Sequence, residues 1–164
     1  MDKEYYKELS SKAADGDAKS FSKLYETLYR NMYYTAFYTL ADEKDAIDAV
    51  IGTARDGFNT INRLRTSEAF EIFMMKTLCA RIKTRCREYG DDIELEGDEQ
   101  PEIKKKLFEL NHTDRLITVL YVCGRTKTPV ISAYTGMLKS NVRKRLLNAL
   151  NELDLDPYLI YKTF

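Results

Sequence analysis

The sequence predicts an all-α protein, with an N-terminal helical bundle and a C-terminal set of shorter helices joined by an acidic linker. Apolar residues recur at three- and four-residue spacing over most of the chain, as on the buried face of a helix. Helix breakers are few, because the 164 residues include only three prolines and seven glycines. One acidic stretch interrupts the periodicity. These features divide the chain into residues 1–88, a linker at 89–101 and residues 102–164.

Three long amphipathic helices are expected in the first region, preceded by a short one over residues 3–14. The first long helix covers 18–40 and follows Asp17, a residue type that caps helices. The second begins after Asp42, another capping residue, and extends over 42–63. Its apolar stripe consists of Ala46, Val50, Thr53, Ala54, Gly57, Phe58 and Ile61. The third begins near Ser67, and its stripe consists of Phe70, Phe73, Met74, Thr77, Leu78 and Ile82.

The charge is segregated although the formal net charge is zero. Residues 88–102 contain eight acidic residues and no basic one, and the segment includes Gly90 and Gly97, which is typical of a solvated linker. Residues 104–150 hold ten basic residues against two acidic ones, and residues 76–87 hold five basic residues alone. Basic segments on both sides of an acidic one indicate a protein that binds a polyanion. We hypothesise that the linker folds back and screens these surfaces in the free protein.

Shorter helices are expected in the second region, at about 102–110, 113–123, 127–135 and 139–153. The last two form the most informative stretch, because their spacing fits a helix-turn-helix. A small residue, Ser132, falls where two crossed helices approach each other, and Gly136 falls in the turn, where it can adopt positive φ. Val142 then anchors the second helix in the core.

The second helix of this unit carries a polar and basic face. It consists of Lys139, Ser140, Asn141, Arg143, Lys144 and Arg145. Such a helix can enter a DNA major groove, with polar residues at base edges and cations at phosphates. The plainer alternative is an ordinary helical hairpin whose basic face is merely solvated.

Four segments, in order, resemble conserved parts of the sigma factors of bacterial RNA polymerase. They are GDAKSFSKLYETLYRNMYYTAF from residue 16, DAIDAVIGTARDGF at 45–58, SEAFEIFMMKTLCARIKTRCR at 67–87 and HTDRLITVLYVCGRTKTPVISAYTGMLKSNVRKRLLNAL at 112–150. The chain has only two such domains and a linker, and in this short form it is similar to the extracytoplasmic-function (ECF) group of sigma factors. This resemblance implies a cytoplasmic transcription-initiation factor whose partners are the polymerase core, at its β′ clamp and β flap, promoter DNA and, in some members, an anti-sigma factor.

The resemblance also implies roles for individual residues. Asp45, Asp48 and Thr53 would contact the β′ clamp, and helix 139–150 would read the −35 element. The residues that would read, open and hold the −10 element are Arg63, Arg65, Ser67, Phe70, Lys76, Arg81, Lys83, Arg85 and Arg87. Phe70 would hold an unstacked base, and Arg115 matches a basic position of the family's C-terminal domain. The acidic linker would follow the RNA-exit path of the polymerase.

Some positions depart from the family pattern. Ile51 and Gly52 stand where the family has Gln and Glu, and Ala80 stands where an Asn is usual. Leu138 and Lys139 replace the Ser-Val that opens the recognition helix, so its N-cap is weak. These departures concern the clamp contact and the promoter preference rather than the apolar pattern.

No motif in the sequence indicates an enzyme, so we expect no catalytic residue, cofactor or metal ion. The one histidine, His112, lies at an expected helix start, and phosphate-binding, metalloprotease and nucleophile motifs are absent. Cys79, Cys86 and Cys123 have neither disulfide-framework nor zinc spacing and are expected to be reduced thiols. The N-terminus lacks an apolar signal segment, and no stretch is apolar enough to span a membrane.

Two alternatives remain open. One is a divergent sigma-like regulator that has lost independent promoter melting, which Ile51, Ala80 and the altered recognition helix motivate. The other is an ordinary helix-turn-helix repressor that acts as a dimer on a palindromic site.

Overall fold

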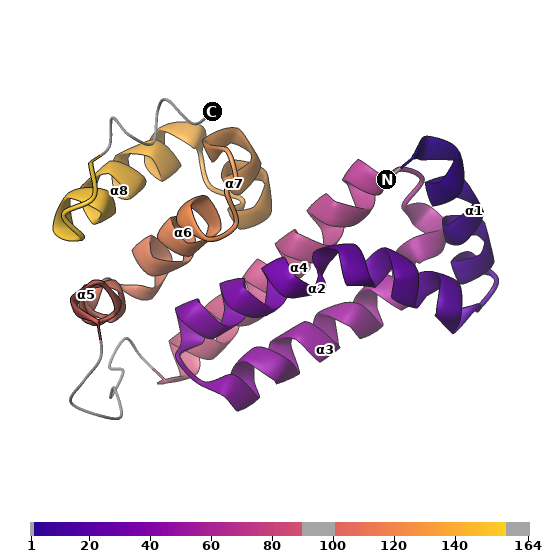
Figure 1. Cartoon of the computed structure of the whole chain (residues 1–164), viewed down its shortest axis with the longest axis horizontal. Helices are drawn as coiled ribbons and strands as arrows, with labels where there is room; N and C mark the ends of the chain where they lie inside the picture. Colours follow the sequence, from indigo (N-terminus) through magenta and orange to yellow (C-terminus); the bar gives the residue numbers. More distant parts are fainter. Residues whose placement is uncertain (1, 90–100, 157–164) are drawn as a thin grey trace.

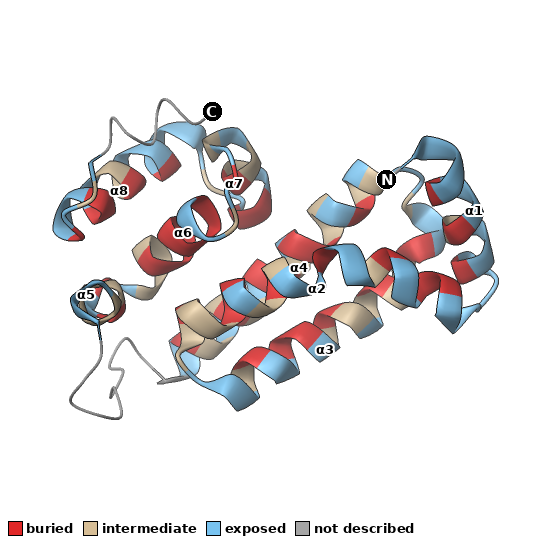
Figure 2. Ribbon diagram, viewed as in Figure 1, coloured by how far each residue is buried: buried red, intermediate tan, exposed pale blue. Residues whose placement is uncertain are grey.

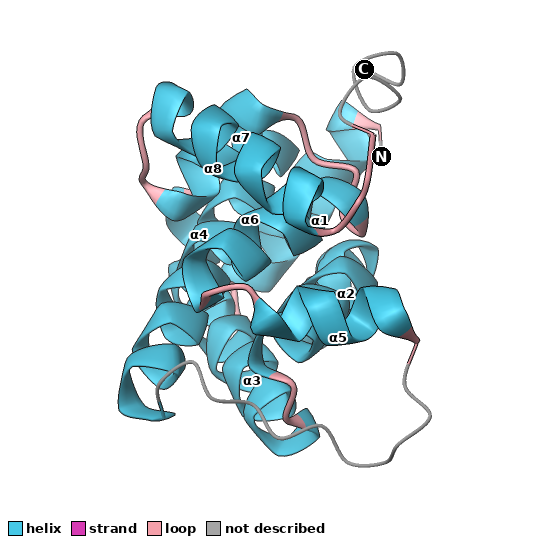
Figure 3. Cartoon of the chain, turned by 90° about the vertical axis from the view of Figure 1, so that its left-hand side faces the viewer, coloured by secondary structure: helices cyan, strands magenta, loops and turns pink. Residues whose placement is uncertain are grey.

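The computed structural model describes residues 2–89 and 101–156, and all its regular elements in that part of the chain are helices (Figure 3). The N-terminal group comprises α1 (Lys3–Ala14), α2 (Ala18–Leu40), α3 (Glu43–Thr60), a 3₁₀ turn (Ile61–Arg63) and α4 (Ser67–Tyr89). The C-terminal group comprises α5 (Glu102–Glu109), α6 (His112–Val122), α7 (Thr128–Thr135) and α8 (Lys139–Glu152). The all-α prediction is therefore confirmed, and the predicted acidic linker lies mainly outside the described residues.

Side-chain caps fix where the N-terminal helices begin. Asp17 accepts a hydrogen bond from Lys19 N and Asp42 accepts one from Asp45 N, in agreement with the capping roles predicted for them. Thr66 caps α4 in the same way through Ala69 N, a cap that was not predicted. Helix α2 ends at Leu40, and the capping residue Ala41 that follows adopts the left-handed conformation with φ 58°. The helices then pack with α2, α3 and α4 side by side and α1 across one end (Figure 1).

Helix α6 is the centre of the C-terminal group. All residues from Arg115 to Tyr121 are buried, so this helix is covered around its whole circumference (Figure 2). Its neighbours include α7 and α8 on one side and α2 and α4 on another. A helix surrounded in this way needs apolar residues on every face, which the sequence LITVLYV supplies.

The two groups share one hydrophobic core in the described residues. Helix α6 packs on α2, and α7 packs on α4. The cluster that contains Leu24 and Leu78 continues without a break into Leu120 and Ile131. The division of the chain into separate modules at 88 and 102 stays a prediction, but in this arrangement the groups are not independent bodies.

Candidate nucleic-acid interface

Helices α7 and α8 form the helix-turn-helix unit. Gly136 ends α7 with φ 70°, and Ser132 Oγ donates a hydrogen bond of 2.6 Å to the carbonyl of Met137, which fixes the turn. Val142 is fully buried and anchors α8. No side chain caps α8 at Leu138, in agreement with the weak cap expected there. The crossing of the two helices therefore depends on the turn and on this anchor.

The first turns of α8 present their polar and basic side chains outward. Lys139, Ser140, Asn141, Arg143 and Lys144 are exposed. Arg145 is half-buried, and its Nη1 forms an ion pair of 2.8 Å with Asp114 on α6. The structure thus brings five of the six predicted recognition residues onto one accessible segment, while the sixth ties α8 to α6.

The predicted −10 residues are spread over a longer surface. Arg63, Arg65, Lys76 and Arg87 are exposed, and Ser67 is half-buried at the first turn of α4. Phe70 is only 2% exposed and packs edge-on against Phe21 in the core. The expectation that Phe70 holds an unstacked base is therefore corrected, because its ring is already part of the bundle core.

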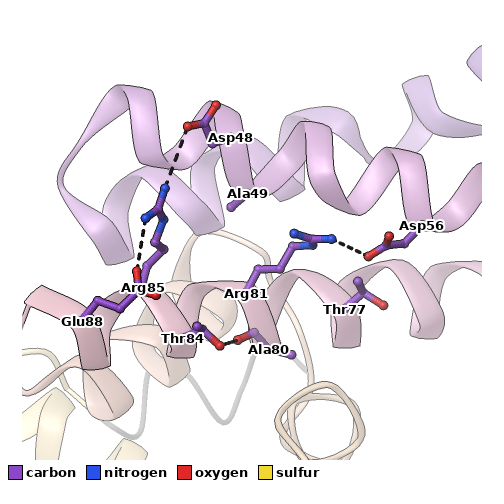
Figure 4. A pocket seen from close by; sticks show the side chains of 9 residues that line it. All are labelled: Asp48, Ala49, Asp56, Thr77, Ala80, Arg81, Thr84, Arg85 and Glu88. Atoms are coloured by element: carbon purple, nitrogen blue, oxygen red, sulfur yellow. Dashed lines mark hydrogen bonds and ion pairs between the residues drawn. The ribbon is translucent and has the colours of Figure 1, made fainter.

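Three of the predicted −10 cations are engaged within the chain. Arg81 forms an ion pair of 2.6 Å with Asp56 (Figure 4). Arg85 forms one ion pair with Asp45 at 3.2 Å and a second with Asp48 at 4.0 Å, and Figure 4 shows the second. Lys83 Nζ donates a hydrogen bond of 2.6 Å to the carbonyl of Thr135 on α7. Burial lowers the pKa of Lys83 below its ordinary value. A DNA phosphate at these positions would have to share each cation with its present partner in the chain or replace that partner.

A polar groove of about 470 Å³ lies between α3 and α4, and its lining includes the pairs Arg81–Asp56 and Arg85–Asp48 (Figure 4). Arg81 crosses it and lies over Gly52, where a Cβ would come within 2.6 Å of Arg81 Nη1. The glycine that departs from the family pattern is therefore what makes room for Arg81. A Glu at this position would compete with Asp56 for the same guanidinium.

The three predicted clamp residues on α3 occupy different environments. Asp48 is exposed, and Asp45 is largely covered by its pairing with Arg85. Thr53 is fully buried and its Oγ1 donates to the carbonyl of Ala49, so its expected contact with a partner is corrected. Thr53 belongs to the apolar stripe with Val50, and helical spacing alone signalled its inward position.

The outward face of α3 also exposes two isoleucines, one of which, Ile51, is a departure from the family pattern. Ile47 is 39% exposed and Ile51 is 53% exposed, and both adjoin Asp48. Their spacing of four residues places them on one face of the helix. An exposed aliphatic pair beside a carboxylate is the strongest candidate on α3 for contact with another protein.

Among residues 2–89 and 101–156, no three His, Cys, Asp or Glu side chains converge as a metal site. Within the same ranges, no helix is both long and apolar enough to cross a bilayer. Cys79 and Cys86 are buried in α4, whereas Cys123 is exposed at the end of α6.

Comparison with known proteins establishes the fold. No family model matches the sequence, and no curated protein matches it. The structure is similar to that of CnrH in complex with the cytosolic domain of CnrY, with a TM-score of 0.71 and 17% sequence identity. The match covers 92% of this chain and 95% of that chain. The chain therefore has an all-α fold similar to that of CnrH.

Proposed function

We propose that this chain is a sigma factor that binds core RNA polymerase and directs promoter-specific initiation of transcription. The observation that carries the proposal is the helix-turn-helix unit of α7 and α8, whose accessible segment bears Lys139, Arg143 and Lys144 and no acidic residue. The likeness to CnrH over nearly the whole chain supports the same assignment, because it includes both helix groups in one fold.

Helix α8 would read the −35 element. Ser140 and Asn141 lie in its first turn, where polar side chains can reach base edges. Arg143 and Lys144 follow them and would neutralise phosphates. Arg63, Arg65, Lys76 and Arg87 would hold DNA near the −10 element, since they are exposed in this arrangement.

Helix α3 would bind the polymerase through Asp48 and the two exposed isoleucines. Apolar side chains at the centre of an interface supply most of its affinity, and a neighbouring charge sets its orientation. Asp45 would become available only if Arg85 leaves it, because the two side chains are 3.2 Å apart. Binding of DNA by Arg85 and binding of polymerase by Asp45 would then favour each other.

Run-off transcription with purified core polymerase tests the proposal. The template is a DNA sequence that the chain and the core enzyme retain together, identified by sequencing the bound DNA. On this template the chain should initiate transcripts without any other initiation factor. The double substitution Arg143→Ala, Lys144→Ala should reduce promoter affinity. It should also make the slope of log affinity against log salt concentration shallower, by about one unit for each phosphate that is no longer neutralised. Lys3→Ala with Lys7→Ala, which removes the same charge from α1, is the control.

The polymerase contact is tested separately. Ile51→Asp should abolish retention of the core enzyme, whereas Ser22→Asp at an exposed position of α2 should leave it unchanged. Retention of core polymerase by Ile51→Asp at the level of the unchanged chain would contradict the role given to α3.

A second candidate function is a sigma-like regulator that binds polymerase but does not melt promoters. The burial of Phe70 and the intrachain pairing of Arg81 and Arg85 favour it, because these residues are the ones expected to act on the opened strand. The same transcription assay separates the two candidates. A regulator of this kind would bind core polymerase, yield no transcript alone and change the output of another sigma factor.

A further inference from the structure

An apolar groove of about 300 Å³ opens where α2, α5, α6 and the chain after α8 meet. Its walls include Tyr38 from α2, Ile103 from α5 and Val122 from α6. Ile103 is 46% exposed and Val122 is 45% exposed. Apolar side chains that converge on a groove and remain this accessible favour a further apolar segment as occupant.

The chain itself supplies such a segment next to the groove. Leu153 and Leu155 form one wall, and Asp156 is the last described residue. The sequence then continues with Pro157 and the apolar run Tyr158, Leu159, Ile160 and Tyr161. Five extended residues span at most about 18 Å, so this run starts and ends within reach of the groove.

We propose that residues 158–161 dock into this groove and cover it. Attachment close to the groove wall gives the segment a high effective concentration there, so even modest apolar burial suffices. A proline at 157 has a fixed φ angle, which reduces the conformational freedom lost on docking. The inference does not depend on the proposed role in transcription.

Docking of this segment would also join the two helix groups. Tyr38 belongs to the N-terminal group, whereas the other walls come from the C-terminal group. A side chain that fills the groove therefore touches both. The segment therefore acts as an additional clasp between the two helix groups.

The thiol of Cys123 provides a direct probe, because it lines the groove and is exposed, while Cys79 and Cys86 are buried. The experiment measures the rate at which an aromatic disulfide reagent modifies Cys123 in the full chain and in a chain ended after Asp156. Removal of residues 157–164 should raise the rate of Cys123 modification on the order of tenfold. This factor is expected if the docked segment leaves the groove open about a tenth of the time.

Full-length variants separate docking from the mere presence of a tail. Leu159→Asp with Ile160→Asp should raise the rate as much as truncation does. Thr163→Asp, which adds a charge outside the apolar run, should leave it unchanged. Equal rates in the full and shortened chains would overturn the proposal. Modification of the normally buried Cys79 or Cys86 would reveal unfolding in any of these variants.

A cross-link tests the same contact without shortening the chain. Ile160→Cys, oxidised with copper–phenanthroline in air, should form an intrachain disulfide with Cys123, and the product should stay monomeric. Ser11→Cys on α1 is the control and should form none. A disulfide-linked dimer would show that the groove receives the C-terminal segment of a second copy. The absence of any disulfide with Cys123 would show that the groove receives neither its own segment nor that of a second copy. Either result overturns the proposal.

Discussion

Arg115 Nη1 donates a hydrogen bond of 2.9 Å to the main-chain carbonyl of Thr39, and this contact joins α6 to the end of α2. Arg115 as a whole is only 1% exposed. Its Nη2 also donates to the carbonyls of Phe108 and Leu110, at 3.0 and 2.7 Å. One buried cation therefore connects α2, α5 and α6. The basic residue that resembles a family position serves here to hold the fold together.

Arg115→Met should lower the free energy of unfolding by about 3 kcal/mol, because it deprives three buried carbonyls of a charged donor while keeping much of the side-chain volume. The measurement is urea unfolding followed by circular dichroism. Arg143→Met, at an exposed site, should change stability by about 0.5 kcal/mol or less. Equal losses in the two variants would contradict the structural role of Arg115.

Tyr134 and Glu71 should be energetically coupled across the contact between α7 and α4. The Tyr134 hydroxyl donates a hydrogen bond of 2.6 Å to Glu71 Oε1. A double-mutant cycle with Tyr134→Phe and Glu71→Ala should give a coupling free energy of about 1 kcal/mol. The matched cycle replaces Glu68, an exposed acid on the same helix, and should show additivity. Additivity in both cycles would mean that this hydrogen bond does not help to hold α7 against α4.

Gly136→Ala should destabilise the helix-turn-helix unit by about 1 kcal/mol, because Gly136 has φ 70° and an L-residue is strained there. A Cβ at this position would meet no atom within 4 Å, so the cost is purely conformational. Gly136→Asn should cost less, since Asn tolerates this conformation better. Thermal unfolding of the three proteins checks the order, and a larger loss for Asn than for Ala would refute the explanation.

Gly52→Ala should release Arg81 from Asp56 with little change in stability. The new Cβ would clash with the flexible end of Arg81, but Ala also favours the helix by about 1 kcal/mol over Gly. The ion pair is partly exposed and contributes at most about 1 kcal/mol. NMR of the Arg81 Nε–H group should show a changed environment. An unshifted Arg81 signal, with stability lowered by several kcal/mol, would mean that the helices rather than Arg81 move.

Stability should fall above about pH 9, partly through Cys79. Burial raises the pKa of its thiol from 9.0 in the unfolded chain to about 12 in the folded protein. Cys79 therefore contributes nothing to the pH dependence below pH 9, where both states hold the proton, and its stabilising contribution is lost as pH rises toward 12. The loss is about 1.4 kcal/mol for each pH unit within this window.

Cys79→Ala should flatten that part of the profile. Its unfolding free energy should be lower at neutral pH because of the lost packing, yet it should decline less steeply than in the unchanged chain. Tyr25, whose pKa burial raises to about 12, still contributes a decline above pH 10 in both proteins. Identical slopes between pH 9 and 10 would show that the thiol does not ionise on unfolding.

Local signals explain why the helices could be predicted closely. Asp17 and Asp42 cap helices through atoms two or three residues away, and the turn at Gly136 depends on its own φ. Thr53 and Phe70 could also have been placed correctly, because both belong to the apolar stripes of their helices. Their assignment to contacts with partners followed the family resemblance and overlooked that periodicity.

Other features of the site had no local signal. Asp45 and Arg85 are forty residues apart in the sequence, and only the packing of α3 on α4 brings them to 3.2 Å. Lys83 looks like any exposed cation of a basic helix until α7 covers it. A charge pattern records how many cations a segment has, but not which of them already have an acidic or carbonyl partner.

The sequence by itself determined the all-α class, the helix bounds to within a few residues and the helix-turn-helix with its outward basic segment, because spacing, caps and turn residues act over a few positions. Tertiary structure alone decided that the two helix groups share one core, that Arg115 joins them and that several predicted DNA-binding cations are engaged within the chain. Those properties depend on which faces meet after distant segments pack, and burial and pairing are defined only once that packing exists.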